Sequence, residues 1–249
     1  MIHQQLHRQP VALDRDAHRT LKIRAQAPDW SVAAALNGYV VHAVEFADLS
    51  KEFPLVFIRV GHDDASGKPL VAPLAVFGLA QGENLFVDGS RWSADYMPAQ
   101  LRAYPFATAR VDARRHAICI DRAWAGFSES EGTPLFGDDG QPGALVREMR
   151  ELLDRLEGET QRTRAFCDRL LALDLLRDMR FDATLPDGQK IAVDGFLAVD
   201  EKRLAELADA DIVALHRDGL LALVTLHQFS LGNLRRLVER RRRRQQAPS

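Results

Sequence analysis

Three polar side chains near the end of the chain recur at a spacing that could support chemistry. His227, Ser230 and Asn233 are separated by steps of three residues, so on a helix they would form one polar notch. A notch that faced a pocket could bind a ligand. A notch that faced the interior would instead need internal partners, because an unpaired buried polar group costs about 1–3 kcal/mol. Ser230 is a poor nucleophile for His227, since both side chains point outward from the helix and rarely align.

A second candidate lies between residues 83 and 104, where polar, aromatic and turn-forming side chains are concentrated. Amphipathic aromatic side chains on fixed turns are typical of pockets and interfaces. A structural loop is the alternative, in which Asn84 and Asp88 cap backbone groups and Trp92 closes the core. We expect the two candidates to line one shared site. Its candidate ligand-binding residues are Glu83, Asn84, Asp88, Trp92, Tyr96, Tyr104, His227, Ser230 and Asn233.

Metal and phosphate sites are not indicated. His42 and Glu45 are three residues apart and could share a metal ion, but two ligands are too few. No His-x-x-x-His or Cys-x-x-Cys pair supplies the others, so Glu45 fits a structural hydrogen bond better. Residues 78–82 contain two glycines but lack the Lys-Ser/Thr of a phosphate cradle. We therefore predict no metal site and no cofactor, and we find no catalytic motif.

Arginines at 235–236 and 240–244 give the chain a basic end. Such a run could contact phosphate or a membrane surface. No aromatic residue follows Phe229, so the run lacks a stacking surface. A solvated, frayed helix end that complements the helix dipole is the favoured interpretation.

Composition limits the class of protein. The chain has 249 residues, 46% of them hydrophobic, and a net charge of −2, so its surface as a whole is not suited to polyanions. Cys119 and Cys167 lie in apolar patterns, which suits reduced core thiols better than a disulfide. No apolar run is long enough for a membrane helix, and the first residues lack the apolar segment of a signal peptide. We expect a soluble, cytoplasmic protein with no nucleic-acid partner.

Hydrophobic periodicity predicts the elements that would hold these side chains. Expected strands and hairpins cover residues 55–60, 71–78, 84–88, 106–121 and 181–198. Expected helices cover residues 40–52, 144–175 and 220–240, with short helices capped by Asp200 and by Asp209 or Asp211. No regular βαβ alternation occurs. The expected class is α+β, a mostly antiparallel sheet packed with a long central helix and a C-terminal helix. We expect one domain over residues 1–249, with 1–17 and 241–249 loose.

Short motifs in a fixed order run from about residue 45 to about residue 235. They are Glu45-Phe46, Phe53-Pro54, the block 83–88, the segment 96–106, Cys119-x-Asp121, the segment 132–136, Leu185-Pro186-x-Gly188, Val199-Asp200-Glu201 and the segment 227–234. Together they resemble the SapC family. The resemblance implies little about activity. Because no catalytic motif is present, we expect a SapC-like accessory or binding protein for a peptide, polypeptide or small molecule.

Two alternatives to a binding protein stay open. One is an enzyme with an unrecognised site near Glu83, Asp121 and His227. The other is an interaction module that docks through the helix at 145–176. Some SapC-like proteins carry a peptide-permease label, which would require membrane spans that the sequence lacks. A closed pocket lined by several titratable groups with shifted pKa values would favour an enzyme, whereas a shallow groove or an apolar patch would favour binding.

Overall fold

The computed structural model describes residues 1–63, 66–111, 116–184, 188 and 190–246. It is 35% helical and 27% strand, and its sheets are antiparallel. These features confirm the predicted α+β class. The chain folds into two compact units, each assembled from several stretches of sequence. The first unit comprises residues 1–33, 89–91 and 99–158, and the second comprises residues 34–88, 92–98 and 159–249. The single-domain organisation stays a prediction.

The first unit contains two small antiparallel sheets, ordered β1-β9-β8 and β10-β2-β11. Its elements are β1 Pro10–Ala12, β2 Lys22–Ile23, η1 Trp30–Ala33, α2 Ala99–Arg102, β8 Phe106–Arg110, β9 His116–Asp121, β10 Phe127–Ser128 and β11 Thr133–Pro134. Pairing of β8 with β9 confirms the hairpin predicted over 106–121. Residues 112–115, between the two strands, lie outside the described residues. The first half of helix α3, Ala144–Ala172, contributes Val146 and Leu153 to the core of this unit.

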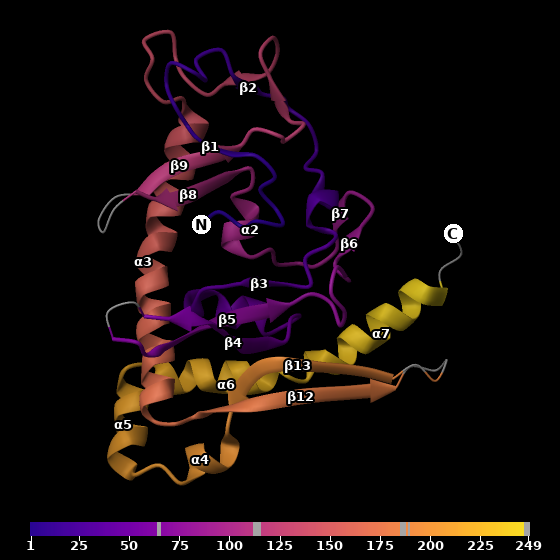
Figure 1. The fold of residues 1–249 in the computed structure, drawn as a ribbon, viewed down its shortest axis with the longest axis vertical. Helices are drawn as coiled ribbons and strands as arrows, with labels where there is room; N and C mark the ends of the chain where they lie inside the picture. Colours follow the sequence, from indigo (N-terminus) through magenta and orange to yellow (C-terminus); the bar gives the residue numbers. More distant parts are fainter. Residues whose placement is uncertain (64–65, 112–115, 185–187, 189, 247–249) are drawn as a thin grey trace. The chain divides into compact units, whose positions relative to one another are not determined.

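The second unit is built on a five-stranded antiparallel sheet, ordered β12-β13-β4-β5-β3 (Figure 1). Its strands are β3 Gly38–Val40, β4 Leu55–His62, β5 Pro69–Val76, β12 Leu176–Thr184 and β13 Lys190–Val199. Its helices are η2 Ala43–Glu45, α1 Phe46–Leu49, α4 Glu201–Ala205, α5 Asp209–Arg217, α6 Leu220–Ser230 and α7 Asn233–Gln246. Strands β6 Val87–Asp88 and β7 Arg91–Trp92 form a separate two-stranded sheet. The predicted strands at 55–60 and 71–78 and the hairpin over 181–198 are confirmed. Pro186-Asp187 of its predicted turn lie outside the described residues.

Phe57 is at the centre of the second unit's core. The first three residues of β4 are all buried, as their β-branched and aromatic side chains predict. The ring of Phe57 lies 6.0 Å from that of Phe166 on α3 and 5.0 Å from that of His227 on α6. Two helices far apart in sequence therefore meet on one strand residue, which fixes where α6 presents its polar side chains.

The long helix predicted over 144–175 is present as α3 and continues through Gly158 without a break. Three other predictions need correction. The predicted helix over 40–52 is confined to η2 and α1, after the short strand β3, and only Val87 and Asp88 of 84–88 form a strand. Asp200 caps α4 as predicted, but the N-cap of α5 is Ala208 and not an aspartate.

The helix predicted over 220–240 is two helices. The N–H groups of Leu231 and Gly232 bond to the carbonyls three residues earlier, at Gln228 and Phe229, and α6 ends there. Helix α7 starts at Asn233 and continues to Gln246. The apolar stripe continues across the break, so hydrophobic periodicity alone could not reveal it.

The ends expected to be loose are structured where they are described. Residues 10–12 form β1 and pair with β9, and the Gln9 N–H donates to Asp121. Residues 241–246 belong to α7. Cys119 and Cys167 are both buried and unpaired. Among the helices of the described chain, none is both long and apolar enough to cross a membrane.

Candidate functional site

The notch residues of the second unit all face inward and bond to the backbone around the start of β4. The His227 ring donates from Nδ1 to the Leu55 carbonyl at 2.8 Å and accepts the Val199 N–H at 3.1 Å on Nε2. Ser230 Oγ accepts the Leu55 N–H at 2.9 Å. Asn233 donates from Nδ2 to the carbonyls of Ser50 and Phe53. These bonds satisfy the buried polar groups and join α6 and α7 to one segment of chain.

The environment of His227 disfavours its charged form. Its side chain is fully buried, and burial lowers its pKa from 6.5 to about 4, against the opposing effect of the bond to Leu55. The two ring bonds also fix the tautomer, with the proton on Nδ1. At neutral pH His227 is therefore a neutral side chain that bridges β4 and β13.

A second buried network surrounds the predicted pair His42 and Glu45. Glu45 Oε2 accepts the His42 backbone N–H at 3.1 Å and lies 3.2 Å from Nδ1 of the same ring. The other ring nitrogen lies 3.1 Å from Thr160 Oγ1. Tyr96 donates its hydroxyl to Glu45 Oε1 at 3.1 Å, and the Ala43 N–H donates to Thr163.

The order carboxylate, imidazole and hydroxyl in this network is the order that hydrolases use. Here, however, the imidazole is only 5% exposed and the carboxylate 4% exposed. Both form a capping box at the start of η2. The two threonines tie that turn to the second half of α3. Packing of this turn against α3 is therefore enough to explain the arrangement, and no substrate is needed to explain it. Within the described residues no group of three His, Cys, Asp or Glu side chains could hold a metal ion.

The segment that follows β5 is folded by its own polar residues. A side chain at Gly78 would place its Cβ 2.0 Å from the Glu83 carbonyl oxygen, so the close turn there requires glycine. Glu83 Oε2 accepts the Leu79 N–H at 2.8 Å. Asn84 is 1% exposed and its side chain accepts the Phe86 N–H at 2.9 Å. These bonds give the loop residues 83–86 a defined path without strand pairing.

Trp92 packs against an aromatic cluster formed by Phe53, Phe77 and Phe86. Its ring lies 5.3 Å from Phe77 and 6.1 Å from Phe86, and Nε1 donates to the Tyr96 carbonyl at 3.0 Å. Phe53 lies 4.5 Å from Phe86 in the same cluster. Trp92 therefore closes a core, as the structural alternative predicted, although it stays partly exposed.

Helix α7 holds this loop through three arginines. The Arg240 guanidinium lies 4.3 Å from the centre of the Phe86 ring, a cation–π contact. Arg241 pairs with Glu83 at 3.4 Å. Arg244 donates to the carbonyls of Asn84 and Val87. The frayed end expected from the sequence is therefore wrong for Arg240, Arg241 and Arg244, because these three side chains contact the loop.

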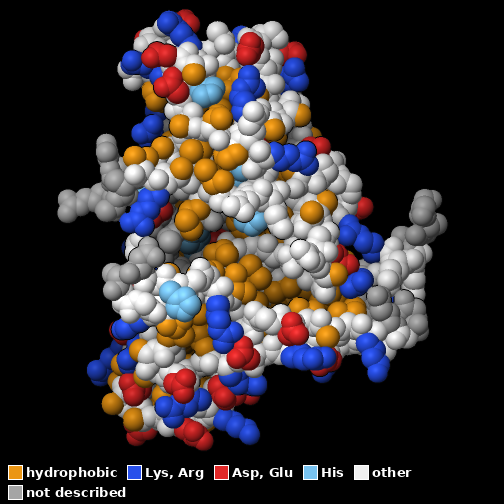
Figure 2. All heavy atoms as spheres, in the orientation of Figure 1, with side chains coloured by type: hydrophobic (Ala, Val, Ile, Leu, Met, Phe, Trp, Pro, Cys, Tyr) orange, Lys and Arg blue, Asp and Glu red, His pale blue; other side chains and the backbone are white. Residues whose placement is uncertain are grey.

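An open groove of about 600 Å³ lies between α7 and the loop. It is lined by Leu85, Asp88 and Ser93 on one side and by the α7 residues Arg236, Glu239, Arg240, Arg243 and Arg244 on the other. On the face drawn in Figure 2, acidic and basic side chains are intermixed rather than separated by sign. The groove differs from this pattern, because it contains four guanidinium groups on a chain whose net charge is −2.

Of the nine predicted site residues, only Asp88 lines this groove. The Asn84 carbonyl accepts from the groove residue Arg244, whereas Glu83 pairs with Arg241, which does not line the groove. Trp92 and Tyr96 do not line it either. The groove arginines were missed as a site. Their spacing was an available signal, because positions 236, 240, 243 and 244 fall on one face of a helix.

Tyr104 belongs to the first unit, where it pairs with a buried aspartate. Its hydroxyl donates to Asp121 Oδ2 at 2.9 Å. Asp121 is fully buried, and burial alone would raise its pKa. Bonds from the Gln9 and Arg8 N–H groups and from Tyr104 outweigh burial, and the pKa of Asp121 lies below its ordinary value. Asp121 therefore stays ionised and joins the first residues of the chain to β9.

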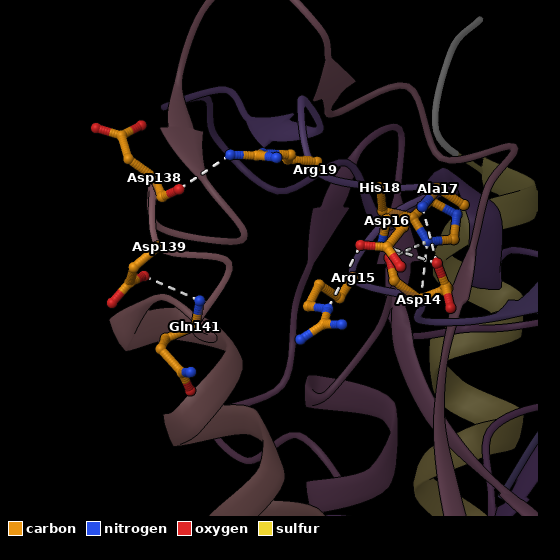
Figure 3. Close-up of polar contacts among 9 residues, drawn as sticks. All are labelled: Asp14, Arg15, Asp16, Ala17, His18, Arg19, Asp138, Asp139 and Gln141. Carbon is orange, nitrogen blue, oxygen red and sulfur yellow. Dashed lines mark hydrogen bonds and ion pairs between the residues drawn. The ribbon is translucent and has the colours of Figure 1, made fainter.

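The first unit also has a small polar depression of about 160 Å³. In Figure 3 the Arg19 guanidinium reaches the Asp138 backbone carbonyl, at 3.0 Å, while the carboxylate of Asp138 points away from it. Asp139 accepts the Gln141 N–H at 2.9 Å, and Asp14 accepts the Asp16 N–H at the same distance. These aspartates shape their own loops, and we assign no ligand to the depression.

Comparison with known proteins identifies the family. No curated protein and no solved structure matches the chain. The family model described as SapC matches residues 13–237 of the 249. The matched range includes β4, the loop that α7 contacts and the first turn of α7. It also contains all of the short motifs on which the resemblance to this family was based. The chain belongs to the SapC family.

Proposed function

We propose that this SapC family protein is a binding protein that takes an anionic polypeptide in the groove that α7 forms with Leu85, Asp88 and Ser93. The observation that supports this proposal is that four arginines line one open groove. A guanidinium stays charged at neutral pH and presents donors that match a carboxylate, but it is a poor general acid or base. The groove chemistry therefore supports recognition rather than catalysis.

The contacts divide the arginines into two groups. Arg240 and Arg244 are held by Phe86 and by backbone carbonyls, so they are already ordered before a ligand arrives. Arg243 is exposed and makes no hydrogen bond or ion pair with the described residues, and Arg236 bonds only to the Lys51 carbonyl. Arg236 and Arg243 therefore have the most donors left for a ligand. Among the same described residues, Arg240 bonds only through Nη1, to Ser93 Oγ at 3.5 Å, and keeps its other donors.

The predicted site residues take separate roles in this proposal. Asp88 contacts the ligand from the loop wall. Glu83 and Asn84 position arginines, and Trp92 and Tyr96 keep the loop in place. His227, Ser230 and Asn233 hold α6 and α7 against β4 and do not touch the ligand. Tyr104, in the first unit, has no role in this groove.

Calorimetric titration with capped peptides of equal length tests the proposal. We expect an acidic peptide to bind and neutral and basic peptides not to bind. Arg243→Gln should weaken binding about three- to tenfold, the range for one charge-assisted contact at a partly exposed site. Arg242→Gln is the matched control, because Arg242 is the exposed neighbour on the same helix and does not line the groove.

Two results would contradict the proposal. One is the absence of binding by any acidic peptide. The other is an equal loss of affinity in Arg242→Gln and Arg243→Gln, which would mean that the helix acts only through its total charge. Both variants should melt at the same temperature as the unaltered protein, since neither removes a contact among the described residues.

A further inference from the structure

The spacing of the groove arginines restricts the shape of a matching ligand. Arg236, Arg240 and Arg243 are separated by four and three residues along α7. At a rise of about 1.5 Å per residue, their Cα atoms are about 6 Å and about 4.5 Å apart along the axis. Side chains on one face of an extended peptide repeat about every 6.6 Å. The first arginine spacing is close to this repeat, and the second is about 2 Å shorter, a difference that a long arginine side chain can span. Carboxylates at alternate positions of an extended segment can therefore meet successive arginines.

A helical ligand with the same charge spacing fits the groove less well. Helices bind grooves by burying an apolar face against apolar side chains. Only Leu85 of the eight lining residues is apolar. An extended segment, by contrast, presents unpaired backbone N–H groups. The carboxylates of Asp88 and Glu239 and the hydroxyl of Ser93 supply acceptors for them in the same groove.

The two carboxylates also distinguish a polypeptide from a nucleic-acid strand. Asp88 and Glu239 stand among four arginines, which leaves a formal excess of two positive charges. An unbroken run of phosphates would be repelled at both carboxylates. A single strand also needs exposed aromatic faces for its bases. The Phe86 ring is fully buried and is covered by the guanidinium of Arg240.

We infer that the groove recognises an extended polypeptide segment carrying two or three carboxylates at alternate positions. This inference rests on the proposed function and specifies its ligand. In the bound state the carboxylates meet Arg236, Arg240 and Arg243 in order along α7. The backbone between them donates to Asp88, Glu239 and Ser93.

Two capped peptides of identical composition test the pattern. One has the order Glu-Thr-Glu-Thr-Glu and the other Glu-Glu-Glu-Thr-Thr, so net charge and length are equal. We expect the alternating peptide to bind about fivefold more tightly in calorimetric titration. The double variant Arg236→Gln with Arg243→Gln should remove the preference, and Arg242→Gln should keep it. Melting curves of each variant show whether the fold is retained.

The outcomes separate this inference from the proposed function. Equal affinity for both peptides would overturn the alternating pattern and leave acidic-peptide binding intact. Binding of neither peptide would overturn both. A thymidine tetranucleotide, which carries three phosphates, serves as the competing class of ligand. If it bound more tightly than the alternating peptide, a polypeptide would be the wrong class.

Discussion

Replacing His227 by glutamine tests whether a neutral histidine joins β4 to β13. The ring donates to the Leu55 carbonyl and accepts the Val199 N–H. A glutamine amide also has one donor group and one acceptor, but it does not titrate. At about pH 7.5 we expect His227→Gln to lower the free energy of unfolding by about 1–3 kcal/mol, because the amide differs in reach from the ring and the two backbone groups are paired less well.

The larger effect is on pH dependence. Burial lowers the pKa of folded His227 from 6.5 to about 4. His227 therefore becomes protonated below about pH 6.5 in the unfolded chain, but only below about pH 4 in the folded chain. Stability from the neutral ring is present above pH 6.5 and is lost as the pH falls through this window. Between about pH 7.5 and about pH 5 the linkage amounts to about 2 kcal/mol for this one group.

Urea unfolding at the two pH values measures the effect. We expect the acid-induced loss of stability to be about 2 kcal/mol smaller in His227→Gln than in the unaltered protein. Ser230→Ala is the matched control, because it leaves the buried Leu55 N–H unpaired but removes no titrating group. It should be destabilised at both pH values by a similar amount and should keep the full pH dependence.

An unchanged acid-induced loss in His227→Gln would refute this account of the ring. Other histidines, such as His7, whose pKa burial also lowers, contribute equally to both proteins and cancel in the comparison. If the variant does not fold, NMR titration of the unaltered protein answers the same question. The His227 ring signals should not shift between about pH 7.5 and about pH 5.

Three further predictions concern single contacts. Tyr96→Phe removes the hydroxyl that bonds to the buried Glu45 carboxylate and should lower the free energy of urea unfolding by about 1–3 kcal/mol. Arg244→Ala leaves the carbonyls of Asn84 and Val87 without this donor and should lower the melting temperature by about 2–6 °C, whereas Arg242→Ala should not. Burial raises the pKa of both cysteine thiols, that of Cys167 to about 12, so a thiol reagent should react with neither in the folded protein and with two per chain in denaturant.

The sequence predicts the elements that are determined locally. Strand β4 follows a proline and is rich in β-branched and aromatic residues, and α3 repeats apolar residues at three- and four-residue spacing. In each case neighbouring residues carry the signal. The boundary between α6 and α7 is different, because residues 231 and 232 interrupt the hydrogen bonding while the apolar stripe continues.

The partners of the polar residues could not be predicted because they lie far along the chain. His227 Nδ1 donates to a carbonyl 172 residues earlier, and Arg244 bonds to one 160 residues earlier. Spacing in the sequence showed that the notch residues share a helix face. It did not show whether the face meets backbone or a cavity. The hydrogen bonds to residues 50–55 agree with the packing interpretation, while a ligand at these residues stays a prediction.

Under the proposed function, the arginine-rich end combines two roles in one sequence pattern. Side chains of Arg240, Arg241 and Arg244 are used by the fold, each on a named partner in the loop at 83–87. Their contacts fix the rotation of α7 about its axis, and that rotation decides which remaining arginines face the groove. Arg243 then faces the groove while its neighbour Arg242 does not. A run of five arginines is chemically uniform, so only the packing of the helix separates those that support the fold from those that are available to a ligand.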